Sequence, residues 1–327
     1  MQIKRIAIVA AAVVALSATA AAQRLPFDRT IETTGPAALD VSTLRGKIDV
    51  RGGAPGKVVV KGTVTVRTDW DVPSNAVEIM REVAANPPIE VAGNSVRLRP
   101  PSDERARRAV TVAYEVEVPP ATRVLTVSDS GATMVSAVTG SVETTTQSGA
   151  IAVAKLGSTA RIRTGSGAVR IDGVDDALSV TTGSSAITAR GLRGDVMLRT
   201  NSGAVDAALT GGGDVDVETA SSAIRLCGAA GGLNAASSSG HLTIHGKPAR
   251  PWAATTGSGG MEIGLDPSAT VALDVSSRSG KVRLDAGPVQ GTVQERRVDG
   301  TLGGGGPLVR AESRSGSIDV ISARSCR

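Results

Sequence analysis

The stretch SGAIAVAKLGSTARIRTGSG, residues 148–167, decides the fold of this chain of 327 residues. It begins with a Ser-Gly pair, continues with apolar residues at alternate positions, and ends at the next Ser-Gly pair. Apolar residues at every second position are typical of β-strands that bury one face. The alternation breaks near Gly157, which predicts two short strands joined by turns in each unit.

Variants of this unit recur along the chain. The serines that begin them, here called the anchor serines, mostly follow one another at intervals of 18 or 19 residues, and the last interval is twice 18. They are Ser130, Ser148, Ser166, Ser184, Ser202, Ser221, Ser239, Ser258, Ser279 and Ser315. So short a repeat indicates one supersecondary unit stacked on copies of itself, because a single unit cannot bury its own apolar face. A repeated motif is also a poor candidate for a unique catalytic centre.

The repeat predicts an all-β fold, a single-stranded right-handed β-solenoid with a β-rich amino-terminal cap. Each coil should have about 18 residues and rise about 4.8 Å. The alternation places Ile162 and the anchor Ser166 on the inner side and Arg161 on the outer side. The glycine after each anchor is expected at a corner with positive φ. Ser185 and Ser222 replace it, so either those corners have ordinary backbone angles or each carries a strain of roughly 1–2 kcal/mol.

The first 22 residues have the composition of a secretory signal peptide. Lys4 and Arg5 precede the apolar run 6–16, and three alanines precede Gln23. That run is too short for a membrane span, and no later segment reaches 18 continuous apolar residues. No cysteine stands at the cleavage point, which argues against a lipid anchor there. The mature chain is therefore predicted to be exported, to the periplasm, the cell envelope or the medium, and not to span a membrane.

Charge and composition exclude several classes of partner. Removal of Lys4 and Arg5 lowers the formal net charge from +5 to +3, and no basic block or aromatic platform appears, so no nucleic-acid partner is predicted. The chain has only four aromatic residues, which suits a thin coil filled by small side chains and argues against a sugar cleft built on aromatic rings. They are Phe27, Trp70, Tyr114 and Trp252.

Cys227 and Cys326 are the only cysteines. In an exported chain they can form a disulfide that ties the tail to the stack. Two separate thiols are the alternative, because the sequence does not show whether the two residues meet.

Residues 23–120 depart from the repeat and are predicted to form the cap, with strands at 39–41, 47–51, 58–66, 90–98 and 110–118. Ser74 is expected to cap one short helix that ends at Pro87-Pro88. The phrase at 46–50 resembles the repeat, so the cap should continue into the solenoid and shield its first coil. The solenoid is expected over residues 121–323, with a loop or hairpin excursion at 287–306 and a smaller insertion at 246–252.

Two clusters of metal-ligand residue types occur. His241 and His245 are four residues apart, but on a strand their rings lie about 13 Å apart, so two exposed histidines are predicted rather than a zinc site. Asp172, Asp175 and Asp176 offer too few oxygens for calcium and are predicted to form a solvated turn.

Two further patterns have architectural explanations. The runs Gly165-Ser166-Gly167 and Gly257-Ser258-Gly259 look like nucleophile or phosphate loops, but both are anchor positions without a following helix or a placed histidine. The threonines at 144–146 and 181–182 are expected to face outward, as strand propensity alone explains. No catalytic, cofactor-binding or metal-ligating residue is therefore predicted.

Several motifs together resemble the bacterial putative-adhesin domain family, a domain of unknown function. They are the Pro119-Pro120 strand exit, the iterated Ser-Gly-x-Ile-x-Val phrase, the loop at 299–306 and the closing phrase at 315–320. The resemblance covers about residues 36–322. It implies a right-handed β-helix exported to the cell envelope and, in some members, a link with envelope-stress systems. It brings no catalytic residues.

The sequence favours an exported, non-catalytic envelope protein that binds or scaffolds as a rigid monomeric solenoid. Its partner is expected to be an envelope protein or a glycan. An envelope-stress regulator is one alternative. A polysaccharide-active β-helix enzyme is the other, and it would need paired carboxylates projecting from adjacent coils.

Overall fold

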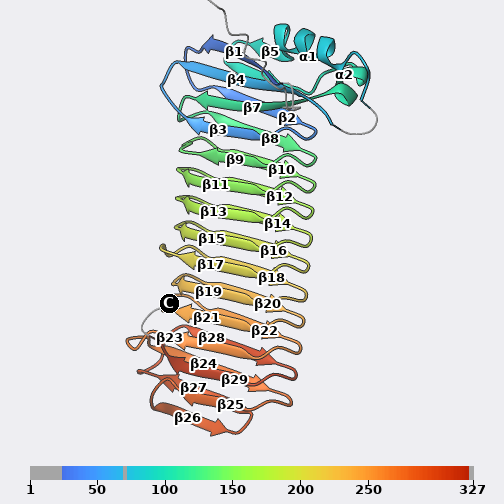
Figure 1. The fold of residues 1–327 in the computed structure, drawn as a ribbon. Coiled ribbons are helices and arrows are strands. Elements are labelled where there is room, and N and C mark those ends of the chain that lie inside the picture. The colour runs from blue at the N-terminus through green and yellow to red at the C-terminus, as the bar shows by residue number, and fades with distance from the viewer. Residues whose placement is uncertain (1–23, 69–71, 324–327) are drawn as a thin grey trace, which may run out of the picture.

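The computed structural model describes residues 24–68 and 72–323, and Figure 1 shows them as a tall stack of strands with helices at one end. The signal peptide predicted at 1–22 lies outside the described residues. The prediction of an all-β fold built from stacked repeats is confirmed, since the described residues form two long sheets and only two helices, α1 (Ala76–Ala85) and α2 (Glu104–Ala109).

Each repeat contributes one strand to each sheet. In spatial order, the 14-stranded sheet contains β1 (Arg24–Glu32), β4 (Lys57–Val66), β7 (Val110–Val118), β3 (Ile48–Gly52), β9 (Thr133–Ser136), β11 (Ile151–Leu156), β13 (Val169–Val174), β15 (Ile187–Leu192), β17 (Val205–Leu209), β19 (Ile224–Ala229), β21 (Leu242–Gly246), β23 (Met261–Leu265), β29 (Ile318–Ser322) and β25 (Val282–Asp285). The 15-stranded sheet contains β26 (Val289–Gln294), β27 (Arg297–Leu302), β24 (Val271–Ser277), β28 (Leu308–Ser313), β22 (Trp252–Thr256), β20 (Leu233–Ser237), β18 (Val215–Thr219), β16 (Val196–Thr200), β14 (Leu178–Thr182), β12 (Ala160–Thr164), β10 (Val142–Thr146), β8 (Arg123–Ser128), β2 (Ala38–Thr43), β6 (Ser95–Leu98) and β5 (Ile89–Ala92).

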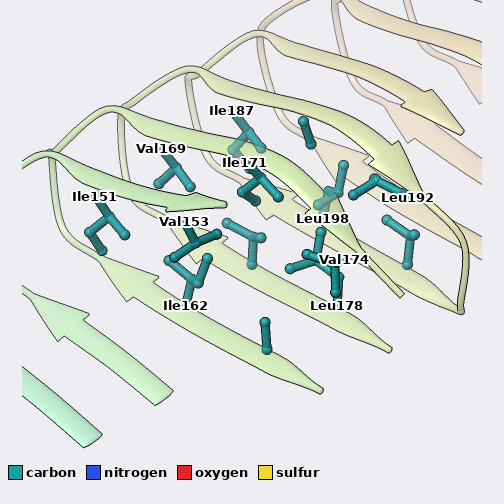
Figure 2. Close-up of a cluster of buried hydrophobic side chains, with 14 of the residues drawn as sticks. Ile151, Val153, Ile162, Val169, Ile171, Val174, Leu178, Ile187, Leu192 and Leu198 are labelled. Carbon is teal, nitrogen blue, oxygen red and sulfur yellow. The ribbon is translucent and has the colours of Figure 1, made fainter. Parts of the chain in front are cut away.

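Neighbouring repeats pair in parallel and in register. Val142 of β10 lies beside Ala160 of β12, which lies beside Leu178 of β14, in steps of 18 residues. Because the register repeats, like positions form files that run along the stack. The inner files are apolar, and Figure 2 shows Ile151, Val169 and Ile187 following one another in this way.

The anchor serines are not part of the core, which corrects the prediction for Ser166. All ten are exposed, whereas the residue two positions before each, a threonine or a serine, is buried. In most repeats the hydroxyl of this buried residue accepts a hydrogen bond from the backbone N–H three residues later, as Thr146 does from Gly149 at 3.0 Å. The corner motif is therefore Thr/Ser-x-Ser-Gly, and its first residue closes the turn.

Close stacking, rather than positive φ, explains why most coils have glycine in this motif. A Cβ on Gly149 would lie 2.1 Å from the carbonyl oxygen of Gly131 in the preceding coil. Ser185 and Ser222 occupy two of these corners with ordinary backbone angles, since the only non-glycine residues with positive φ in the described segments are Ala137 and Lys155. Of the two alternatives for these serines, ordinary backbone angles are therefore confirmed and strain is wrong. Their hydroxyls bond carbonyl oxygens of the preceding coil, Ser222 to Ser202 at 2.6 Å.

Replacing Thr164 by valine should lower the free energy of unfolding by about 1–3 kcal/mol, because the buried N–H of Gly167 then loses its acceptor. Thr181→Val changes an exposed threonine in the next coil. Its free energy of unfolding should stay within about 0.5 kcal/mol of that of the wild-type protein. Urea unfolding followed by circular dichroism measures both. Equal effects of the two substitutions would contradict the role of the buried hydroxyl.

Left-handed backbone occurs at another corner of the 14-stranded sheet. Lys155 has φ of 54°, and Gly173, with φ of 83°, holds the equivalent place one repeat later. Lys155→Gly should raise the free energy of unfolding by about 0.5–1 kcal/mol by removing this strain. Gly173→Ala should lower it by about 1–2 kcal/mol for the same reason. Urea midpoints that shift in the same direction for both would contradict this explanation.

The amino-terminal region covers the first coil. Strands β2 and β3 already pair in register with β8 and β9, as the repeat-like phrase at 46–50 predicts. Antiparallel strands β1, β4 and β7 then cover one sheet edge, and the β5–β6 hairpin covers the other. Antiparallel covers of this kind prevent edge-to-edge pairing with other molecules.

Details of this cap differ from the sequence prediction. The segment 90–98 forms two strands, β1 and α2 were not expected, and Asn75 rather than Ser74 is the N-cap residue of α1. Phe27 of the unexpected β1 packs edge-to-face on Tyr114, with ring centroids 6.2 Å apart. Burial raises the pKa of the Tyr114 phenol, whose hydroxyl donates to the carbonyl oxygen of Arg99.

The carboxyl-terminal coils do not stack in chain order. The last coil, β28 and β29, lies between the coil of β22 and β23 and the coil of β24 and β25. The excursion at 287–306, expected as a loop or a hairpin, forms the β26–β27 hairpin, and β27 pairs antiparallel with β24. The hairpin thereby covers the last edge of the 15-stranded sheet, whereas β25 is the last strand of the 14-stranded sheet (Figure 1).

Candidate functional site

A groove follows the side of the stack where the strands of the 15-stranded sheet begin. We call it the side groove. It has a volume of about 950 Å³ and runs from Arg123 to Pro251, past the starts of seven consecutive strands, β8 to β20. At a spacing of about 4.8 Å between strands it is roughly 29 Å long. It is therefore an extended site rather than a pocket for a single small molecule.

The repeat explains how the side groove forms. The first residue of each of these strands from β10 to β20 is apolar and turns into the core, as Val142, Ala160 and Leu178 do. The residue before it is small in several coils, such as Ala177 and Gly232, so nothing fills the space above the strand start. The residue after it points outward, and it forms a rim together with charged residues at or just before some strand starts, namely Arg123, Asp195 and Asp214.

The rim carries separated charges. Arg123 and Arg161 lie toward the amino-terminal end of the groove with Glu143 between them, and Asp195, Asp214 and Asp216 lie toward the other end with Arg250. A partner that follows the groove would thus meet a mainly basic part and then a mainly acidic part.

The acidic side chains of the rim take part in stacking contacts. Asp195 accepts a hydrogen bond from the N–H of Asp214 at 2.8 Å, and Asp214 accepts one from the N–H of Gly232 at 2.6 Å. Asp214 also pairs with Arg250 at 2.8 Å. These carboxylates therefore hold neighbouring coils together.

Asp216 is held in the same way. Its carboxylate accepts from Arg199 at 3.0 Å and from the side-chain amide of Asn234 at 2.9 Å. The side groove thus offers many polar contacts distributed over its length, and not one converging group of reactive side chains.

The two histidines differ in their surroundings. His241 is exposed, as predicted, but the side chain of His245 is only 17% exposed, which corrects the prediction for it. Its Nε2 lies 2.6 Å from Oε1 of Glu262. The ring fits because Gly264 beside it has no side chain, and a Cβ there would lie 2.5 Å from the ring. The glycine that makes room for the ring belongs to the next coil, so the sequence of a single repeat does not show that His245 can be buried.

The aspartates at 172–176 do not converge. Asp175 pairs with Arg193 at 3.0 Å, Asp176 accepts from the N–H of Ala177, and all three aspartates are exposed. In residues 24–68 and 72–323, no three His, Cys, Asp or Glu side chains gather in a way that suits a metal ion.

The glycine-serine runs are corners of the stack. Gly167 and Gly259 donate their N–H groups to Thr164 and Thr256, and Ser166 and Ser258 are exposed. The threonine prediction is wrong for the residues that point inward, since only the threonines at 145 and 181 face outward. Those buried are Thr144, Thr146 and Thr182.

Cys227 lies in β19 and is not a free thiol. Cys326 lies outside the described residues, so its pairing with Cys227 stays a prediction. No helix of the described segments is long and apolar enough to cross a membrane.

Comparison with known proteins places the fold in a wider context. A family model described as Toastrack DUF4097 matches residues 115–321, and no curated protein matches the chain. A solved structure described as a putative cell adhesion protein from Clostridium sporogenes ATCC 15579 aligns with 92% of this chain and 100% of its own, at 9% identity and a TM-score of 0.19. A putative adhesin from Bacteroides fragilis NCTC 9343 aligns with 91% of this chain and 97% of its own, at 12% identity and a TM-score of 0.26. Structural similarity at this level carries no conclusion about function.

Proposed function

Because this chain belongs to the Toastrack DUF4097 family, we propose that it is an exported, non-catalytic protein of the cell envelope. Its stack serves as a rigid module that binds or scaffolds an envelope protein or a glycan. The family assignment bears out the resemblance to a domain of unknown function, and it assigns no reaction. Support for a binding function rather than an enzymatic one must therefore come from the surface of this chain.

In this proposal the stack is a right-handed solenoid with about 18 residues per coil, and the protein acts as a monomer. The register supports the coil length, since β10, β12, β14 and β16 pair in steps of 18 residues. Antiparallel strands cover both sheets at the amino-terminal end and the 15-stranded sheet at the other end, which favours a monomer over end-to-end association. The amino-terminal sequence, with two cations before an apolar run, supports export.

The observation that carries the proposed function is the side groove. A groove about 29 Å long fits an extended polymer, such as roughly nine residues of a peptide strand. Its floor is apolar, its rim is polar, and its carboxylates are already engaged in contacts between coils. Many modest contacts along a rigid face suit binding without chemistry.

Blocking the side groove tests the proposal. Ser179→Arg places a long side chain on its rim, at a position where the preceding coil already has Arg161, so the fold should tolerate it. Thr188→Arg makes a matched change on β15 of the other sheet. We expect Ser179→Arg to weaken binding to polysaccharide or protein isolated from the envelope of the source bacterium at least tenfold, and Thr188→Arg to leave it unchanged.

Thermal unfolding of both variants provides the control for folding. Binding of neither envelope fraction by the wild-type chain would contradict the proposed function. Equal binding by the two variants would contradict the role of the side groove.

A further inference from the structure

The cations near the carboxyl-terminal end of the stack fall into two groups. Seven lysines and arginines lie between residues 271 and 322. Four of them pair with carboxylates at 3.2–3.4 Å, namely Lys281, Arg283, Arg297 and Arg310. Arg278, Arg296 and Arg314 have no carboxylate partner within 4.0 Å in the described part of the chain.

The non-sequential stacking brings these three arginines together. Arg278 directly follows β24 and Arg314 directly follows β28, and the N–H of Arg278 donates to the carbonyl oxygen of Ser313 at 3.0 Å. The two arginines therefore hold the same position on neighbouring coils. Arg296, from the turn of the β26–β27 hairpin, donates its Nη1 to the carbonyl oxygen of Arg278 at 3.3 Å.

Like charges on adjacent strands repel each other. Every other cation on these coils is balanced by a carboxylate, so this corner holds an excess of positive charge. An anionic ligand would relieve the repulsion, and guanidinium groups bind carboxylates through paired, charge-assisted hydrogen bonds.

The arginines border a groove of about 620 Å³, which we call the end groove. Arg278 and Arg314 line it together with three outward hydroxyls, those of Ser238, Thr255 and Ser276. It crosses the ends of β20, β22, β28 and β24, a distance of about 14 Å. That length exceeds the size of a single phosphate or acetate ion.

Two observations bear on the kind of ligand. None of the large exposed apolar side chains lines the end groove, so it does not suit an acyl chain or an apolar peptide. Glu312 also lines it, but its Oε1 lies 3.9 Å from Nε of Arg310, which partly balances its charge. Guanidinium groups beside a row of hydroxyls match a ligand that carries carboxylates and hydroxyls together.

We propose that the end groove binds an anionic oligosaccharide, with uronic-acid carboxylates on Arg278 and Arg314 and sugar hydroxyls on the serine and threonine side chains. The end groove lies where the strands of the 15-stranded sheet end, and the side groove lies where they begin. The two sites are therefore separate. The inference rests on the proposed function only in one respect, which is that this protein binds its ligands without catalysing a reaction on them.

The test uses a hexasaccharide of galacturonic acid and the full mature chain in isothermal titration calorimetry. Its methyl ester is the matched ligand, because the ester keeps the sugars and removes their charge. The double variant Arg278→Gln/Arg314→Gln should weaken binding of the acid at least tenfold. Arg283→Gln removes an arginine from the same end of the stack but outside the end groove. Its affinity for the acid should stay within twofold of that of the wild type. Binding should also weaken as sodium chloride is added.

Three results would overturn the inference. They are equal binding of the acid and the ester, unchanged binding in the double variant, and binding of inorganic phosphate as tight as that of the hexasaccharide. Failure here is distinguishable from failure of the proposed function. If the hexasaccharide does not bind while Ser179→Arg still weakens binding of the envelope fraction, only the end groove assignment is wrong.

Discussion

A chain that ends at Gly306 should lose its folded structure from β24 onward and not only the two strands that are deleted. In the intact protein β28 pairs with both β22 and β24, and β29 pairs with both β23 and β25. Removal of this coil leaves a gap inside the stack. Each buried apolar side chain that is lost contributes about 1.5–3 kcal/mol, and those of the deleted strands include Val309, Ile318 and Val320.

Limited proteolysis and size-exclusion chromatography measure the effect. We expect cleavage between β23 and β24 in the truncated chain, and association of the chain through its uncovered strand edges. A synthetic peptide of residues 307–322 should restore protection, because it can pair with both edges. If the truncated chain resists protease from β24 to β27 as the full chain does, the inserted position of the last coil is wrong.

Trp252→Ala should lower the free energy of unfolding by about 3–5 kcal/mol, the usual cost of a large core truncation. Trp252 is 2% exposed, and it is the largest of the fully buried side chains in the described residues. It lies between Leu233 and Val309 in its file, next to the inserted coil. Its Nε1 donates to the carbonyl oxygen of Gly231 at 2.9 Å, and alanine removes this bond as well.

Trp252→Leu is the matched control, because leucine already occurs at this position of the file in β20. It should cost less than alanine, since it leaves a smaller cavity. Urea unfolding followed by circular dichroism measures both. A loss of less than about 1 kcal/mol for the alanine variant would contradict the account of this core position.

The alternation of apolar residues was sufficient to predict the strands of the repeat, and its interruption at 287–306 indicated an excursion there, either a loop or a hairpin. It could not place residues at corners, where the alternation stops. The alternation therefore placed both Thr164 and the anchor Ser166 on the inner side, whereas only Thr164 is buried. The close contact between glycines of successive coils could not be predicted from a single repeat either, because it forms only when the coils stack.

The order of the last coils could not be predicted for a related reason. The interval of 36 residues between Ser279 and Ser315 fits either a coil at the end of the stack or one inserted earlier. Parallel strands with the same inner pattern pair equally well in either order, so local sequence does not distinguish them. The end groove depends on this order, since it places Arg314 beside Arg278. The side groove likewise depends on small residues that become neighbours only in the stack.

The most direct test of the central claim, that the side groove is the binding surface, is oxidative footprinting of two methionines. Met197 lines the side groove and is 39% exposed, whereas Met134 lies on β9 of the other sheet and is 41% exposed. The two should oxidise alike in the free protein. Mass spectrometry of the protein bound to its envelope ligand should show Met197 protected and Met134 unchanged. Equal oxidation of Met197 in the free and bound protein would contradict the claim.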